Sequence, residues 1–324
     1  MSGAIKKLLL LPHLQVHNAN ALSSPYTIGF PAVTGFLGAV HAMQRQIQEL
    51  GFTCTFEATG IISHTMDLQT YRGANDFVSS IIGTGNPLDK TGSRSPFIEE
   101  ARCHLDISLL IELQSLNKDD EKSFLDAISQ LLHRRIRIAG GVIQQFHTPE
   151  IRVVANEQDM KSLQRKLMPG YVLIERRDLM IESMQQGQDA TDALLDYLTI
   201  HHHSNQDDDG KVRWTSQRKS RPDQAPGWIV PIATGFHGIS DLDTAKNQRD
   251  PEVPHRFAES VVTLGEFKMP YRLHSLEDML WRYHYNTGSN LYLCQQGRMH
   301  DVAVAAGVST QPDNHLIYDE FGEY

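Results

Sequence analysis

Two segments far apart in the chain alternate between apolar and polar residues, and this alternation constrains the fold more than any other feature. Residues 102–113 place Cys103, Leu105, Ile107 and Leu109 on one face, and Arg102, His104, Asp106 and Ser108 on the other. In residues 8–17 an apolar run is followed by the same pattern, with His13, Gln15 and His17 on the polar face. Because successive side chains of a strand point to opposite faces, both segments are predicted to be half-buried strands.

Segments with apolar residues at helical spacing alternate with these strands along the chain. Residues 34–49 carry Phe36, Val40, Met43 and Ile47 on one face after Thr34 as N-cap, and a second helix is predicted from Asp119 or Asp120 to about 135. Further strands are expected at 53–63 and, interrupted by glycine, at 138–143. The order βαββαβ is that of a ferredoxin-like (RRM-like) α+β fold. In that fold the first and third strands are neighbours, and helices cover the apolar face while the polar face stays open for a ligand.

The length of 324 residues suits two modest domains. Residues 1–150 are predicted to form the ferredoxin-like core, with a loop-rich insertion near 70–98. Residues 151–297 form a second α+β region, with strand candidates at 151–155, 170–175 and 228–233, a helix at 188–200 and a short helix around 276–283. Residues 201–226 have almost no apolar content and read as an exposed loop, and the sequence assigns no structure to a tail at 298–324.

Composition narrows the class of protein. The net charge of −9 argues against a chain coated in basic surface but leaves room for a local basic groove. No run approaches the roughly 20 apolar residues that span a bilayer, and no cleavable leader is evident, so a cytoplasmic protein without membrane contact is expected. The three cysteines, Cys54, Cys103 and Cys294, are too widely spaced for a metal pair and read as buried thiols.

A cluster of cations lies beside two glycines. Arg134, Arg135 and Arg137 precede Gly140 and Gly141. Arginines pair with phosphates through a planar fork, and glycines let a phosphate backbone come close. The alternative interpretation is a charge bias at a helix C-terminus followed by a bulge.

A second basic stretch, residues 211–221, combines five cations with Trp214, which suits nucleic acid as well as it suits a solvated loop. The preceding run of three histidines and then three aspartates, within 201–209, has poor spacing for convergent ligands, so neither a metal site nor a cofactor is expected. No GxSxG, P-loop or GxGxxG motif is present. The sixteen histidines include potential general bases, among them His17, His41, His64 and His104.

Several longer runs resemble a known family. They are 8–25, 29–31, 34–36, 41–45, 98–104, 137–141, 167–171, 227–232, 264–267, 280–281 and 291–292. In this order they look like the second Csy-family subunit of type I-F CRISPR systems. The resemblance extends from about residue 8 to 293 and does not include the tail.

The resemblance implies membership of the repeat-associated mysterious protein (RAMP) superfamily, with a glycine-rich loop after the second helix, where Gly140 and Gly141 fall. It implies a non-catalytic subunit of the Cascade surveillance complex in antiviral defence. Such subunits pair with the large subunit as a heterodimer, hold the 5′ handle of the CRISPR RNA and cap the filament beside the adjacent backbone subunit. Target DNA near the protospacer-adjacent end is a further candidate contact, and its sequence is read mostly by guide pairing.

Position and chemistry select the residues expected to contact RNA. Short polar side chains can read splayed bases, and arginines can neutralise phosphates. These residues are His17, Asn18, Asn20, Ser23, Ser24, His41, Arg45, Arg102, His104, Arg134, Arg135, Arg137, Gly140, Gly141 and Arg256. Two alternatives stay open: a metal-independent endoribonuclease that processes repeat RNA with a histidine, and a protein-interaction adaptor that does not contact RNA.

Overall fold

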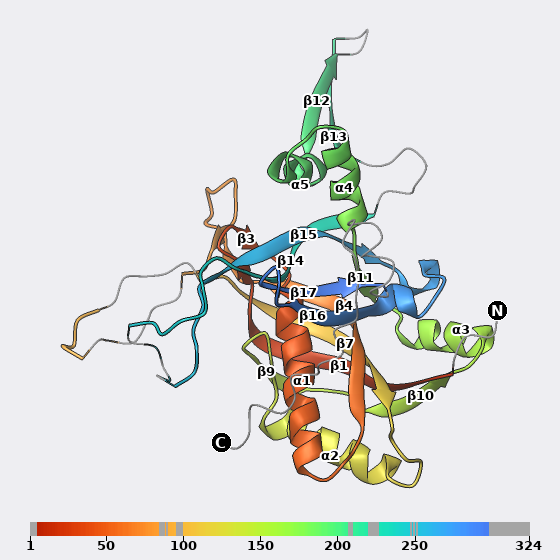
Figure 1. Ribbon diagram of the computed structural model, residues 1–324. Coiled ribbons are helices and arrows are strands. Elements are labelled where there is room, and N and C mark those ends of the chain that lie inside the picture. Colours follow the sequence, from red (N-terminus) through yellow and green to blue (C-terminus); the bar gives the residue numbers. More distant parts are fainter. Residues whose placement is uncertain are drawn as a thin grey trace.

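The computed structural model describes residues 5–83, 88, 90–94, 100–206, 210–219, 227–246, 248, 250 and 252–297. It has helices packed on a large antiparallel sheet of eleven strands, which confirms the expected α+β class (Figure 1). The predicted tail lies outside the described residues, as do parts of the predicted 70–98 insertion and of the 201–226 loop. None of the described helices is long and apolar enough to cross a membrane.

The first 150 residues supply the strands at one end of this sheet. Their elements are β1 (Lys6–Asn20), β2 (Leu22–Ser24), β3 (Thr27–Ile28), α1 (Val33–Glu49), β4 (Thr55–Leu68), β5 (Thr70–Tyr71), β6 (Ser80–Ile81), β7 (Arg102–Gln114), α2 (Glu121–Arg134), β8 (Arg137–Ile138) and β9 (Gly141–Gln145). The sheet order here is β4-β7-β1-β9-β8, with every neighbour antiparallel. The first and third predicted strands, β1 and β7, are therefore neighbours, as expected.

The rest of the chain extends the same sheet. Its elements are β10 (Glu150–Val154), α3 (Glu157–Lys166), β11 (Tyr171–Glu175), α4 (Arg177–Gln185), α5 (Ala190–Leu198), β12 (His201–Gln206), β13 (Val212–Gln217), β14 (Trp228–Gly238), β15 (Ala258–Lys268), the 3-10 turns η1 (Pro270–Arg272) and η2 (Glu277–Met279), β16 (Leu280–Asn286) and β17 (Leu291–Gln296). β10 pairs with β1, while β11 and β16 both pair with β4. The pairings from β4 through β16, β17, β14, β15 and β11 thus return to β4.

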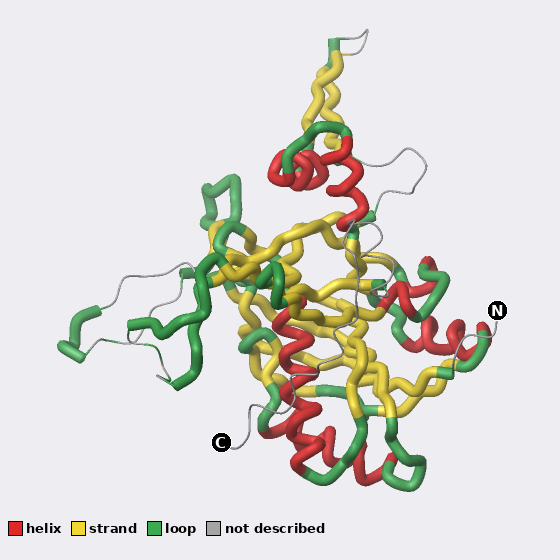
Figure 2. Tube along the Cα trace, viewed as in Figure 1, coloured by secondary structure: helices red, strands yellow, loops and turns green. Residues whose placement is uncertain are grey.

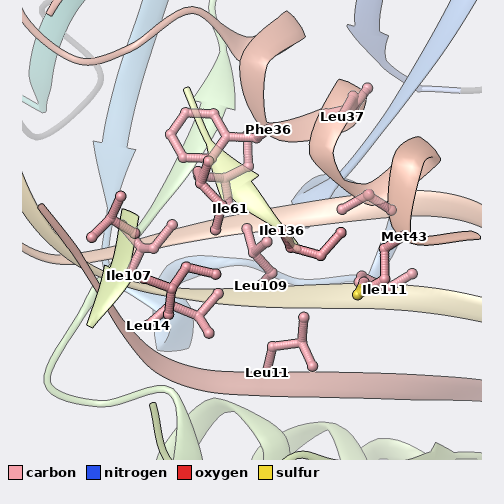
Figure 3. Close-up of a cluster of buried hydrophobic side chains, with 14 of the residues drawn as sticks. Leu11, Leu14, Phe36, Leu37, Met43, Ile61, Ile107, Leu109, Ile111 and Ile136 are labelled. Carbon is pink, nitrogen blue, oxygen red and sulfur yellow. The ribbon is translucent and has the colours of Figure 1, made fainter. Parts of the chain in front are cut away.

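The main core lies between the sheet and α1 and α2. Alternate residues of β1 and β7, including Leu14 and Leu109, face Phe36 and Met43 of α1 (Figure 3). Trp281 of β16 belongs to the same cluster, so the two regions of the chain share a core. Burying apolar area at roughly 25 cal/mol per Å² is the main stabilising contribution of such a cluster.

The opposite face of the sheet is open only in part, which corrects the expectation of a fully open polar face. Leu8 and Leu10 of β1 and Leu110 of β7 point there and are buried against Met160 of α3 and Met279 of η2. The chain after β9 returns over this end of the sheet. The half formed by the end of β1 and the start of β7 keeps a row of polar, partly exposed side chains.

Local patterns misled the prediction at several points. The glycine-interrupted strand is instead a tight hairpin of β8 and β9, and α1 begins after Ala32, with no side-chain cap from Thr34. The helix expected around 276–283 is the single turn η2 followed by β16. The conformation of each of these short segments is decided by the strands beside it in the sheet, and local periodicity in the sequence does not reveal those neighbours.

Residues 201–206 and 210–217 are exposed, as predicted, but 201–206 and 212–217 pair as the strands β12 and β13. This arm projects beyond α4 and α5 at the top of Figure 1, and Figure 2 shows it as an isolated pair of strands. At its base Lys219 forms an ion pair with Asp196 and lies over the ring of Tyr197. Arg218 donates to the carbonyl oxygen of Ile229 at 3.3 Å. Two of the five cations in this basic stretch therefore anchor the arm to the body.

Candidate nucleic-acid interface

A continuous row of side chains crosses five strands on the open part of the sheet. Register places Asp67 of β4 opposite His104 of β7. The His104 ring stacks on His17 of β1, with ring centroids 4.0 Å apart and planes at 21°. His17 is opposite Val142 of β9, and Val142 is opposite Arg137 of β8. Because directly opposed residues share a face of a sheet, these five residues form one surface, which we call the open row.

Hydrogen bonds hold the centre of the open row in place. Asn18 has a left-handed φ of 57°, and its backbone N–H donates to Nδ1 of His104 at 3.2 Å. The Gln69 amide donates to Oδ1 of Asn18 at 2.7 Å and lies 3.1 Å from Nε2 of His104. The result is a partly exposed platform of imidazole and amide groups held in one arrangement. Such groups can hydrogen-bond to base edges, and imidazole rings can stack on bases.

The β8–β9 hairpin borders this platform. Its two turn residues, Ala139 and Gly140, both have positive φ, 47° and 77°, as a type I′ turn requires. The backbone N–H of Asn20 donates to the carbonyl oxygen of Ala139 at 2.9 Å, which fastens the turn to β1. Gly140 is exposed, and an added Cβ there would meet nothing within 4 Å.

Three exposed arginines surround the hairpin. Arg134 ends α2, Arg135 follows it, and Arg137 opens β8. Among the residues that the structure describes, no hydrogen bond or ion pair occupies their guanidinium groups. The predicted cluster of cations beside glycines is therefore present and available to phosphate groups.

Gly141 has a structural role that the sequence did not indicate. It is buried, and a Cβ there would lie 2.6 Å from Cγ1 of Val16, 2.8 Å from the carbonyl oxygen of His17 and 2.9 Å from Cα of Ala19. Its missing side chain therefore lets β9 approach the irregular part of β1. Gly141 supports the open row from beneath and does not itself offer space to a phosphate.

Replacing Gly141 by alanine is expected to lower the free energy of unfolding by about 1–3 kcal/mol, because two of the three clashes are with backbone atoms. Gly140→Asn is the matched control, since asparagine tolerates positive φ and the position is open, and it should cost less than about 1 kcal/mol. Urea unfolding followed by circular dichroism measures both. Equal stability of the two variants would contradict this role.

Four of the expected RNA contacts have internal partners. Arg102 forms an ion pair with Glu100 at 2.7 Å. The Asn20 side-chain amide donates to the carbonyl oxygen of Leu22 and accepts from the backbone N–H of Leu22, both at 3.1 Å. The hydroxyls of Ser23 and Ser24 bond to Thr27, and Ser24 is 4% exposed. Asn20, Ser23 and Ser24 therefore shape the turn after β1, and the buried Ser24 lies outside the candidate surface.

The remaining predicted residues lie elsewhere. His41 and Arg45 are on α1, where His41 bonds through Nδ1 to the hydroxyl of Tyr283 at 3.1 Å. Arg256 bonds to the side chains of Tyr285 on β16 and of Asn290, which precedes β17, outside the open row. The structure therefore unites His17, Asn18, His104 and the arginine–glycine hairpin, and it separates His41, Arg45 and Arg256 from them. Gln69 also lies in this group, beside Asn18 and His104. The sequence did not indicate it, because it follows a strand and is part of no motif.

The position of His41 leads to a pH prediction. Burial, and secondarily the charge of Arg45, lowers the pKa of His41 below 6.5. Glu57, Arg282 and Tyr283 line the same small cavity. Since the folded state resists a proton that the unfolded state accepts, the stability contributed by neutral His41 is present above about pH 6.5 and is lost as pH falls.

The fall in unfolding free energy between pH 7 and pH 5 should be smaller in His41→Gln than in the natural chain. Thermal or urea unfolding at a series of pH values measures the two slopes. Parallel slopes would show that His41 takes up its proton equally in both states.

Comparison with known proteins identifies the family. The family model described as CRISPR-associated protein (Cas_Csy2) matches residues 9–294. The chain is also similar to the CRISPR-associated protein Csy2 of Pseudomonas aeruginosa (strain UCBPP-PA14), with 33% identity over 328 residues, covering 92% of this chain and 98% of the relative. The matched residues include the whole open row and the β8–β9 hairpin. The resemblance seen in the sequence is thereby confirmed, and the chain belongs to the Csy2 family of CRISPR-associated proteins.

Proposed function

We propose that this chain is a non-catalytic RNA-binding subunit of a type I-F CRISPR surveillance complex and holds the 5′ handle of the CRISPR RNA. The observation that carries the proposal is the open row, which ends at Arg137 beside two further exposed arginines. Membership of a CRISPR-associated family supports the biological setting. The sheet order β4-β7-β1-β9, with α1 and α2 packed on one face, supports a ferredoxin-like core.

The chemistry of the open row suits a constant single-stranded RNA. His104 of the open row presents an imidazole to base edges, Asn18 and Gln69 beside it present amide groups, and His17 adds an exposed ring on which a base can stack. Phosphates then pair with the arginines of the hairpin. Because the chain carries a net charge of −9, attraction of RNA depends on this local cluster and not on the overall charge.

We further propose that the chain pairs with the large subunit, caps the filament beside the adjacent backbone subunit and lies near target DNA at its protospacer-adjacent end in the cytoplasm. The arm of β12 and β13 supports an assembled state. All twelve of its strand residues are exposed. A two-stranded hairpin is marginally stable alone in water, so a partner surface would stabilise it.

The second candidate is a metal-independent endoribonuclease. A group of three histidines favours it: His13 stacks on His64 at 4.0 Å between ring centroids, and His147 lies 4.8 Å from His13. A pair of histidines can supply a general base and a general acid. Ser108, whose hydroxyl lies beside His64, is 2% exposed, too buried for that hydroxyl to reach a substrate phosphate.

A binding titration tests the proposal. Labelled handle RNA and a scrambled RNA of equal length are titrated with the chain, alone and co-expressed with its large-subunit partner, in chelator at two salt concentrations. The expected result is tight, handle-dependent binding with no shortening of the RNA, weakened by salt. Cleavage of repeat RNA would favour the ribonuclease, and binding that ignores the handle sequence, or no binding with the partner present, would overturn the proposal.

A further inference from the structure

A second group of side chains lies on the open part of the sheet, toward its covered end. It combines His13 of β1, His64 of β4 and Asp106 of β7. We propose that these three residues bind a divalent transition-metal ion of the zinc class. One potential ligand atom from each residue lies within 4.8 Å of the others. This inference does not depend on the RNA-binding proposal.

The orientation of His64 prepares it to be a ligand. Its Nδ1–H donates to the carbonyl oxygen of Pro169 at 2.6 Å, which leaves the lone pair on Nε2. That nitrogen lies 2.7 Å from the hydroxyl of Ser108. A carbonyl that accepts the second ring proton is the usual support of a metal-binding histidine, because it fixes both tautomer and ring orientation. For an ion to bind at Nε2, the Ser108 side chain would turn its hydroxyl away from that nitrogen.

His13 and Asp106 already meet. Nδ1 of His13 lies 3.1 Å from both carboxylate oxygens of Asp106. Zinc–ligand bonds are about 2.0–2.2 Å long, so two ligands of one ion lie roughly 3 Å apart or slightly more, and an ion here would replace the proton that Nδ1 of His13 donates to the carboxylate. The side chains of all three residues are half-buried, so an ion could enter from solvent.

The backbone at His13 is held in a sparsely populated conformation. Its φ is 49°, and the pairing of β1 with β7 is irregular between Leu11 and Leu14. The backbone N–H of His13 donates to Ser108 Oγ at 3.0 Å, which stabilises this geometry. Such conformations concentrate at functional sites, where a side chain must be aimed away from the regular pleat. Here the irregularity places the His13 ring on that of His64, with centroids 4.0 Å apart and 23° between planes, so one ring would turn about its side-chain bonds for both nitrogens to face one ion.

The donor set selects the class of metal. Two imidazoles and one carboxylate match the three protein ligands of zinc sites that keep a fourth position for water. Mg²⁺ and Ca²⁺ prefer oxygen ligands and would bind here weakly. His147, whose backbone N–H is fixed to the carbonyl oxygen of Pro12 at 3.0 Å, borders His13 with ring centroids 4.8 Å apart but is not one of the three convergent ligands. A bound ion would join β1, β4 and β7.

Isothermal titration of the metal-free, full-length chain with Zn²⁺, and separately with Mg²⁺, tests the site. We expect saturable Zn²⁺ binding that is weakened at least about tenfold in His64→Gln and in Asp106→Asn, with no saturable Mg²⁺ binding. His203→Gln is the matched control, because His203 stands on the arm with His201 as a neighbouring ring at 6.4 Å. It should leave the Zn²⁺ affinity within about twofold, the reproducibility of such affinities.

The visible spectrum of bound Co²⁺ gives a second measurement on the natural chain. A tetrahedral spectrum that is lost in His13→Gln is expected, which keeps the test valid if Asp106→Asn does not fold. Absence of saturable Zn²⁺ binding to the natural chain would overturn the proposal. Unchanged affinity in His64→Gln together with loss in His203→Gln would also overturn it, because the ion would then bind to the arm.

Discussion

Trp281→Ala should lower the free energy of unfolding by about 3–5 kcal/mol, the range for removing a fully buried tryptophan. Trp281 is 0% exposed and belongs to the core that α1 and the strands of the first region share. Its indole N–H donates to the carbonyl oxygen of Leu173 at 2.9 Å. The residue therefore joins β16 to β11 and to the main core. Urea unfolding monitored by circular dichroism measures the loss.

Two controls separate core packing from loss of a ring in general. Trp281→Phe retains most of the buried area and gives up the hydrogen bond, so it should cost about 1–3 kcal/mol. Trp228→Ala removes an indole that is 64% exposed and should cost less than about 1 kcal/mol. A single transition for all variants is expected, because both regions contribute strands to one sheet. Stability of Trp281→Ala within about 1 kcal/mol of the natural chain would contradict the shared core.

Replacing Arg134, Arg135 and Arg137 together by glutamine should weaken handle RNA binding about tenfold to a hundredfold at physiological salt. Each phosphate contact to single-stranded nucleic acid contributes roughly 0.7 to the slope of log affinity against log salt. Loss of three contacts should therefore reduce that slope by about 2. Stability should change little, since the three side chains are exposed and, within the described part of the chain, have no internal partner. Titrations at several salt concentrations measure affinity and slope together.

A charge-matched variant shows whether position or net charge is responsible. Lys118, Lys122 and Arg165 are exposed cations outside the hairpin, and glutamine at all three changes the net charge by the same amount. This variant should keep the handle affinity within about threefold, since exposed charges beyond a Debye length are largely screened. Equal weakening by both triple variants would mean that the arginine cluster has no specific role.

The parts of the fold that depend on local pattern were predictable. The alternation in 8–17 and 102–113 identified β1 and β7 as neighbours, and helical spacing identified α1 and α2. The polar arm was not predictable as strands, because no apolar alternation marks it and only mutual hydrogen bonds define it. The helix α3 was missed although Asn156 caps it, since only two of its residues, Met160 and Leu163, are buried.

The candidate site, like the fold, has parts that the sequence alone predicts and parts that only strand pairing brings together. The arginines beside Gly140 are adjacent in sequence, so the cluster was visible without a structure. Gln69 and His104 meet only through the pairing of β4 with β7. His13 and Asp106 are 93 positions apart along the chain, and the irregular register of β1 and β7 between Leu11 and Leu14 decides where they meet. The histidine run at 201–203 offered a more obvious metal motif, yet the three-ligand group among the described residues lies at His13, His64 and Asp106.

Ultraviolet crosslinking tests the central claim most directly. The chain is assembled with its large-subunit partner and handle RNA, irradiated and digested, and the crosslinked peptides are identified by mass spectrometry. Crosslinks are predicted within residues 17–20, at His104 and in the β8–β9 hairpin, and they should be lost when the handle is scrambled. Crosslinks confined to the β12–β13 arm, or to the partner alone, would contradict an RNA-binding role for the open row.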